Sequence, residues 1–282
     1  LFVSNNGRQL REFLYTDVEQ AYMAQNLSLL SSEIMSDPID LSFNQHDSVL
    51  YVVLEDGTIS NLTLYRTEQV KGWSKIRTEG SFVSVAISGD DLYFITKRGD
   101  KYYLELTDAD FFVDCGIKQE SPVPQKVWSG FDLFEGKEIS IMADGYTVDK
   151  CCVENGSITL LNDASVIYAG YPYSHVIEPL PHMIDGGFKP YPPTTYRIIS
   201  GIFRIIDSGS FYIDMGNGQM SVPLRKMSDN QILEAERIKY SGDIKLRSIG
   251  WIRDMDKSPW RIESDDPSSF TLLSVSTTIK QK

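Results

Sequence analysis

The stretch LYVVLEDG at residues 50–57 decides the fold, because it returns 42 residues later as LYFITKRG at residues 92–99. Each copy is followed by a second apolar segment, LTL at 62–64 and LEL at 104–106. Each copy is also preceded by an alternating segment, so at least three antiparallel strands are expected per repeat. A period of this length is typical of a β-propeller blade.

The first residues, LFVSNNGR at 1–8 followed by 10–15, match the repeat from its second strand onward. Residues 1–107 are therefore expected to form a partial β-propeller of two to three blades. A closed ring needs about four to eight blades, and each blade must stack on neighbours. Either further blades lie upstream of Leu1 or another chain covers the open face, and we favour the first interpretation.

Composition narrows the function. The chain has 282 residues, with 27 basic and 39 acidic side chains and a formal net charge of -12. This charge argues against general attraction to DNA or to anionic membranes. An acidic conduit that lets DNA pass without gripping it would have the same sign, and so would an ordinary acidic surface.

Apolar runs are too short for a membrane helix, which needs about 18 residues. The three cysteines, Cys115, Cys151 and Cys152, do not suggest a disulfide framework. We therefore expect no membrane segment and synthesis in a reducing cytoplasm.

Outside the repeat, one short helix is expected near residues 27–34, capped by Asn26 or Ser28. Residues 108–178 are expected to form a small β-barrel unit, with a strand at 111–114 and a break at SPVP, 121–124. Further strands are expected within 136–145, at 156–160 and at 164–170.

Residues 179–282 are expected to form a C-terminal β-sandwich preceded by a proline-rich arm at 179–193 that lacks regular structure. This arm either contacts a neighbouring subunit or is a surface loop. A long strand at 196–207 is expected to pair with 211–214. Strand 111–113 is assigned to the same sheet, which makes residues of about 120–170 an insertion. The predicted fold class is thus mainly β.

Residues that carry chemistry are few. The histidines, His46, His175 and His182, have no zinc spacing with one another or with the cysteines. The segment from Gly130 to Glu138 lacks the spacing of a phosphate-binding loop. We therefore predict no metal, no cofactor and no catalytic residue, and the protein is not expected to be an enzyme.

Two groups of side chains keep other functions open. The pairs Asp254 with Asp256, Asp265 with Asp266, and Asp207 with Asp214 fit turns, where Asp bonds to the backbone, but also calcium loops or a glycosidase pair. The four tryptophans fit cores or a sugar-binding surface, and they are Trp73, Trp128, Trp251 and Trp260.

Several of these segments resemble phage tail nozzle proteins, also called tail tubular protein B. The similarity lies in VVLEDGT at 52–58, VKGWS at 70–74, VSVA at 83–86 and YYLE at 102–105. Toward the end it lies in Ser241-Gly242-Asp243 and in FTLL at 270–273. The segments FDLFEGK at 131–137 and ADG at 143–145 resemble a small β unit that phage proteins share with the first catalytic cysteine half-domain of ubiquitin-activating enzymes.

The resemblance implies a structural virion protein in the tail of a phage or prophage, synthesised in the bacterial cytoplasm. Such proteins form a ring, usually a hexamer, around the channel for DNA ejection, and they contact other tail proteins without recognising DNA sequence. Family members carry a further N-terminal half, which this chain lacks. The alternatives are a carbohydrate-binding or host-recognition module of a virion and a glycoside hydrolase.

Overall fold

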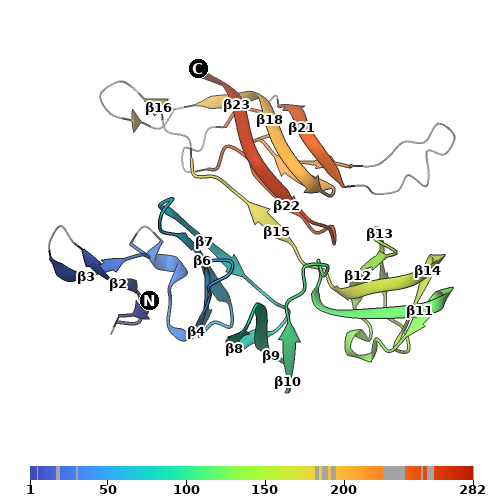
Figure 1. The fold of residues 1–282 in the computed structure, drawn as a ribbon. Coiled ribbons are helices and arrows are strands. Elements are labelled where there is room, and N and C mark those ends of the chain that lie inside the picture. The colour runs from blue at the N-terminus through green and yellow to red at the C-terminus, as the bar shows by residue number, and fades with distance from the viewer. Residues whose placement is uncertain are drawn as a thin grey trace. The chain divides into compact units, whose positions relative to one another are not determined.

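The computed structural model describes residues 1–4, 6–16, 20–29, 31–181, 184–185, 190–191, 195–224, 239–248, 250–252 and 257–281. The chain divides into two compact units, Leu1–Asp110 and Phe111–Lys282. Both are built from antiparallel sheets (Figure 1), and the prediction of a mainly β chain is confirmed. Every helix among the described residues is a short 3-10 helix, and none is long and apolar enough to span a membrane.

The first unit contains three sheets in chain order. The first sheet has the order β1 (Phe2–Val3), β2 (Leu10–Thr16), β3 (Ala21–Asn26). The second has the order β4 (Pro38–Asn44), β5 (Val49–Leu54), β6 (Ile59–Tyr65), β7 (Val70–Ile76). The third places β9 (Asp91–Arg98) between β8 (Ser81–Ser88) and β10 (Lys101–Leu106). The repeat therefore forms the second and third sheets.

The second sheet is covered on both faces. Along β5, Leu50, Val52 and Leu54 belong to a core shared with the first sheet. Tyr51 and Val53 belong to a different core, shared with the third sheet. Because successive side chains of a strand point to opposite faces, one strand supplies two cores.

Polar contacts also join the second and third sheets. The Asp40 carboxylate in β4 accepts hydrogen bonds from the Ser84 hydroxyl at 2.6 Å and from the Val85 N–H at 3.0 Å. The turn between β5 and β6 requires glycine, because Gly57 has a φ of +79° and an added Cβ would lie 2.6 Å from the Ser81 Cβ. These contacts fix how the two sheets meet.

The helix predicted over 27–34 is wrong. The chain instead forms β3, a turn, and the 3-10 helix η1 (Ser32–Ile34). The residues expected to cap a helix are used differently: the Asn26 side chain accepts a hydrogen bond from the Ser28 N–H at 3.0 Å, and the Ser28 hydroxyl accepts one from the Leu10 N–H at 3.1 Å. Local side-chain bonds of this kind favour a turn over a helix.

The second unit begins with a sheet in the order β11 (Asp114–Ser129), β14 (Ser157–Tyr171), β12 (Glu138–Ala143), β13 (Tyr146–Cys152). The 3-10 helix η2 (Asp132–Phe134) precedes β12. The core of this sheet includes Phe131, Phe134 and Ile141, each fully buried. Residues 111–113, predicted as a strand of the C-terminal sheet, are not in a strand, and β11 pairs with β14 instead.

Two strand boundaries differ from the prediction. Residues 121–124 do not break the chain, because β11 continues through Pro122 and Pro124 with a shift of register between Glu120 and Gln125. Proline lacks an N–H donor, yet β11 is an edge strand whose outer side needs no donor. The segments at 156–160 and 164–170 are likewise one strand, β14.

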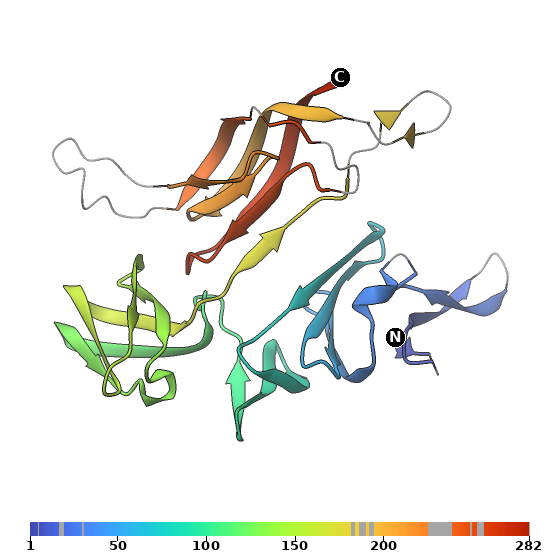
Figure 2. The same cartoon turned by 180° about the vertical axis from the view of Figure 1, so that it is seen from behind.

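Two further sheets share one core. One has the order β15 (His175–Ile177), β22 (Arg261–Ser264), β19 (Phe211–Asp214), β20 (Gln219–Val222). The other places the long strand β18 (Tyr196–Ser208) between β21 (Tyr240–Arg247) and β23 (Thr271–Gln281), as Figure 2 also shows from behind. Phe203 from β18 and Phe211 from β19 both enter the common core.

The predicted hairpin of 196–207 with 211–214 is therefore wrong. The chain crosses from one sheet to the other at Gly209, where an added Cβ would lie 1.8 Å from the Ser268 hydroxyl oxygen. The Ser208 hydroxyl accepts a hydrogen bond from the Thr271 N–H at 2.9 Å, which holds the crossing against β23. Apolar residues of both strands point inward from opposite sides of the core.

The proline-rich arm is only partly described. Two short strands in it, β16 (Ile184–Asp185) and β17 (Pro190–Tyr191), pair with each other, so the expectation of no regular structure is wrong there. Residues 182–183, 186–189 and 192–193 of the arm lie outside the described residues.

Candidate functional site

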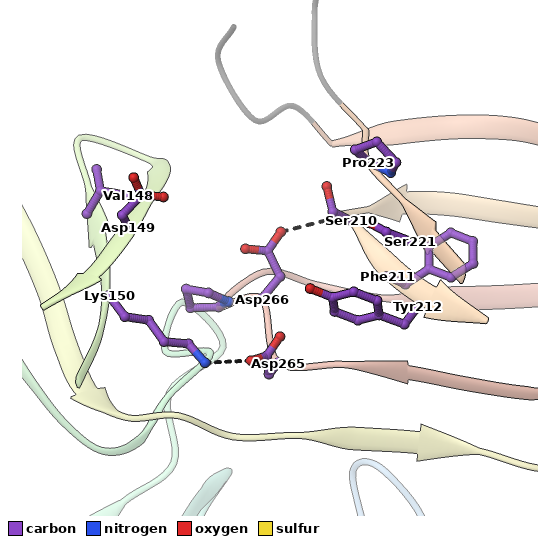
Figure 3. A pocket seen from close by; sticks show the side chains of 11 residues that line it. Val148, Asp149, Lys150, Ser210, Phe211, Tyr212, Ser221, Pro223, Asp265 and Asp266 are labelled. Carbon is purple, nitrogen blue, oxygen red and sulfur yellow. Dashed lines mark hydrogen bonds and ion pairs between the residues drawn. The ribbon is translucent and has the colours of Figure 1, made fainter. Parts of the chain in front are cut away.

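A cavity of about 340 Å³ lies in the second unit. Its wall comes from three segments: residues 148–150 of β13, residues 210–212 with 221 and 223 around β19 and β20, and residues 265–267 after β22 (Figure 3). Segments distant in sequence thus line one space that is open to solvent. It holds three carboxylates, one ammonium group, two serines and a tyrosine.

Polar contacts organise this cavity. The Lys150 ammonium group forms an ion pair with the Asp265 carboxylate at 2.5 Å. The Asp266 carboxylate accepts a hydrogen bond from the Ser210 N–H at 3.3 Å. Tyr212 is 41% exposed and directs its hydroxyl toward the side where Asp265 and Asp266 lie (Figure 3).

The predicted pairs of aspartates that the structure describes lie in different parts of the second unit, and only one of these pairs lines the cavity. Asp214 caps a turn, accepting hydrogen bonds from the Gly216 N–H at 2.8 Å and the Gly218 N–H at 3.2 Å. Asp207 lies at the end of β18, 3.4 Å from the Lys239 ammonium nitrogen. Only Asp265 and Asp266 line the cavity, and Asp254 with Asp256 lies outside the described residues.

The histidines do not come together where they are described. His46 is exposed in a turn, and its N–H donates to the Asn44 side chain at 2.9 Å. His175 packs on Phe270 at 5.1 Å between ring centroids, and burial lowers its pKa. His182 lies outside the described part, within which no three His, Cys, Asp or Glu side chains are arranged to hold a metal ion.

All three cysteines are in the described part of the chain, and none forms a disulfide. Cys151 packs against the core of its sheet, whereas Cys152 is exposed. Burial, followed by the charges of Cys152 and Glu138, raises the pKa of the Cys151 thiol. A thiol with a raised pKa is a poor nucleophile at neutral pH.

The tryptophans do not form a sugar-binding surface. Trp128 and Trp260 are buried in two cores, and Trp73 packs against a third while its indole N–H donates to the Leu27 carbonyl at 3.2 Å. Trp251 is 38% exposed and stacks under the Arg197 guanidinium at 5.2 Å. Core packing therefore accounts for three of the four rings.

The segment from Gly130 to Glu138 forms a packed turn that leads into β12. The Glu135 carboxylate accepts hydrogen bonds from the Asn155 N–H at 3.0 Å and the Gly156 N–H at 2.7 Å. Phe131 and Phe134 are fully buried. The backbone donors of Asn155 and Gly156 are thus occupied by this protein's own carboxylate.

The first sheet exposes an aromatic cluster, which we name the β2–β3 face: Phe13, Tyr15 and Tyr22. These side chains are 60%, 53% and 66% exposed. Phe13 and Tyr22 stack in parallel at 4.9 Å, and Tyr15 meets Tyr22 edge-on at 5.2 Å. Leu10, which points the other way, is fully buried against the second sheet.

The third sheet exposes an aliphatic and aromatic cluster, which we name the β9–β10 face: Ile95, Tyr102, Leu104 and Leu106. Ile95 and Leu104 are direct cross-strand partners, and Leu104 is 74% exposed. The side chain of Phe94 points to the opposite face of the third sheet and is buried against the second sheet. The first unit therefore presents apolar side chains on both of its outer sheets.

No model of a known protein family matches the chain, and no curated protein sequence matches it significantly. The sequence does not predict the cavity, although one of the predicted acidic pairs, Asp265 with Asp266, forms part of its wall. Lys150 and Asp265 are far apart in the chain, so no local motif marks their contact.

Proposed function

We propose that the chain is a structural component of a phage or prophage tail, of the tail nozzle type, that forms part of a ring around the DNA exit channel. The observation that carries this proposal is the construction of the first unit. The central strands of its middle sheet, β5 and β6, are buried between two cores, and its outer sheets carry the exposed β2–β3 and β9–β10 faces. Stacked sheets of this kind are the building principle of propellers.

In this proposal the three sheets are propeller blades, the sheet from β11 to β14 is the small β-barrel unit, and the last two sheets are the β-sandwich. Exposed apolar faces are covered by further sheets or by ring neighbours. A net charge of -12 suits a wall that DNA passes without binding. The protein acts by shape, in the virion tail, and not as a catalyst.

Particle size tests the proposal. The full-length protein is expected to form rings, measured by analytical ultracentrifugation and electron microscopy. Replacing Phe13 and Tyr22 by serine is expected to abolish the rings, because it removes the stacked aromatic pair. The matched control is Tyr65→Ser, since Tyr65 is 44% exposed outside both faces.

Circular dichroism checks that each variant is folded. A full-length wild-type protein that stays monomeric at every concentration would count against the proposal. So would rings that tolerate the double substitution as well as they tolerate Tyr65→Ser, because assembly would then not use the β2–β3 face.

A further inference from the structure

We propose that the cavity between residues 148–150, 210–212 and 265–267 binds a neutral saccharide. This site would add recognition to a structural role, and it does not depend on the proposed ring.

The size of the cavity suits a small ligand. Its volume of about 340 Å³ lies at the lower end of the range for small-molecule sites, which is about 300–1,000 Å³. A single sugar ring or a short oligosaccharide end fits this range. A folded partner protein would need a broad surface instead.

The charges exclude several ligand classes. The cavity contains Asp149, Asp265 and Asp266 against the single cation Lys150. A phosphate, a nucleotide or an acidic sugar would be repelled by this excess of carboxylates. A metal ion is disfavoured too, because in the described part of the chain no three acidic, His or Cys side chains are arranged to hold one.

The remaining polar groups match hydroxyl groups. Lys150 with Asp265 offers a donor beside an acceptor, and the hydroxyls of Tyr212 and Ser221 can donate or accept. A saccharide presents neighbouring hydroxyls that need both kinds of partner. An apolar ligand would leave these groups without partners, at a cost in affinity.

The apolar part of the lining suits the C–H face of a sugar. Tyr212 is half-exposed, whereas its neighbour Phe211 is fully buried, so one ring is presented to the cavity and the other supports the wall. Pro223 and Pro267 add two rigid apolar rings. Aromatic and proline rings give contact area with few rotatable bonds, which lowers the entropic cost of binding.

Ligand-observed NMR with the full chain tests the site. The probes are glucose, galactose, mannose and N-acetylglucosamine, each also as a disaccharide, at up to about 10 mM because weak sugar binding falls in the millimolar range. At least one probe is expected to bind. Tyr212→Ala should weaken that binding roughly tenfold, and Asp266→Asn about threefold or more.

Tyr65→Ala is the matched control, since Tyr65 and Tyr212 have similar exposure and Tyr65 lies outside the cavity. If Tyr212→Ala fails to fold, Tyr212→Phe and Asp266→Asn decide the question. Absence of binding by every probe would overturn the proposal. Binding that is equally strong in the cavity variants and in Tyr65→Ala would also overturn it, because the sugar would then sit elsewhere.

Discussion

The second and third sheets of the first unit arise from the same repeat but have different surroundings. In the second sheet, Leu62 is fully buried in a core shared with the first sheet. In the third, Leu104 occupies the matching place in the repeat and is 74% exposed. The pairing of the strands differs: Leu62 lies opposite Leu50, on the face that packs against the first sheet. Leu104 lies opposite Ile95, on the face away from Phe94 and the second sheet. The comparison shows that a repeated sequence predicts the strands, whereas the register of their pairing decides which face a given side chain joins.

The largest difference is expected between two substitutions that shorten the matching leucine side chains to alanine. Leu62→Ala is expected to lower the free energy of unfolding by about 2–5 kcal/mol, because it leaves a cavity in a packed core. Leu104→Ala should change it by about 0.5 kcal/mol or less in the isolated chain. Urea denaturation measures both values, and equal losses would contradict the difference in burial.

A second test concerns the polar link between these sheets. Asp40→Ala is expected to lower the free energy of unfolding by about 1–3 kcal/mol, because it removes the hydrogen-bond acceptor for the Ser84 hydroxyl and the Val85 N–H. The control is Asp90→Ala, at an exposed position in the turn before β9. If thermal unfolding shifts equally in both variants, Asp40 does not couple the sheets.

A third test compares a half-buried histidine, His175, with an exposed one, His46. Burial lowers the pKa of His175 in the folded chain, so below about pH 6.5 the unfolded chain takes up the proton more readily. Stability is therefore expected to fall as the pH drops from 7 toward 5. His175→Phe should flatten this fall in denaturation midpoints, whereas His46→Gln should leave it intact.

The smallest effect is expected at an exposed pair. Arg204 donates hydrogen bonds to both oxygens of Asp243, at 2.7 and 2.8 Å, and these bonds and the guanidinium charge lower the pKa of that carboxyl. The contribution of this pair to the stability of the fold is present above about pH 3.9, and it is lost as the pH falls through the pKa of Asp243 in the folded chain.

Arg204→Gln should raise the pKa of Asp243 toward its ordinary value, as followed by NMR titration. Stability at neutral pH should hardly change, because exposed ion pairs contribute little. An unchanged pKa would show that this pair does not persist in solution.

Much of the strand content could be predicted from the sequence. The repeat at 50–57 and 92–99 combines alternation with a glycine turn, and both copies form the expected strands. These signals are local, so neighbouring residues suffice to recognise them.

Long-range arrangement could not be predicted in the same way. The chain crosses between sheets at Gly209, although the sequence around it looks like a hairpin turn. Asn26 and Ser28 resemble helix caps, but their partners are each other and the distant Leu10 backbone. The cavity depends on Lys150 meeting Asp265, and nothing in either local segment specifies that partner.

The adjacent cysteines of β13 have a practical consequence. Neighbouring side chains of a strand point to opposite faces, so Cys151 packs toward the core while Cys152 faces water. A maleimide dye should therefore attach preferentially at Cys152 over its neighbour. Such a label, near residues 148–150 of the cavity wall, would give a fluorescent reporter without any engineered thiol.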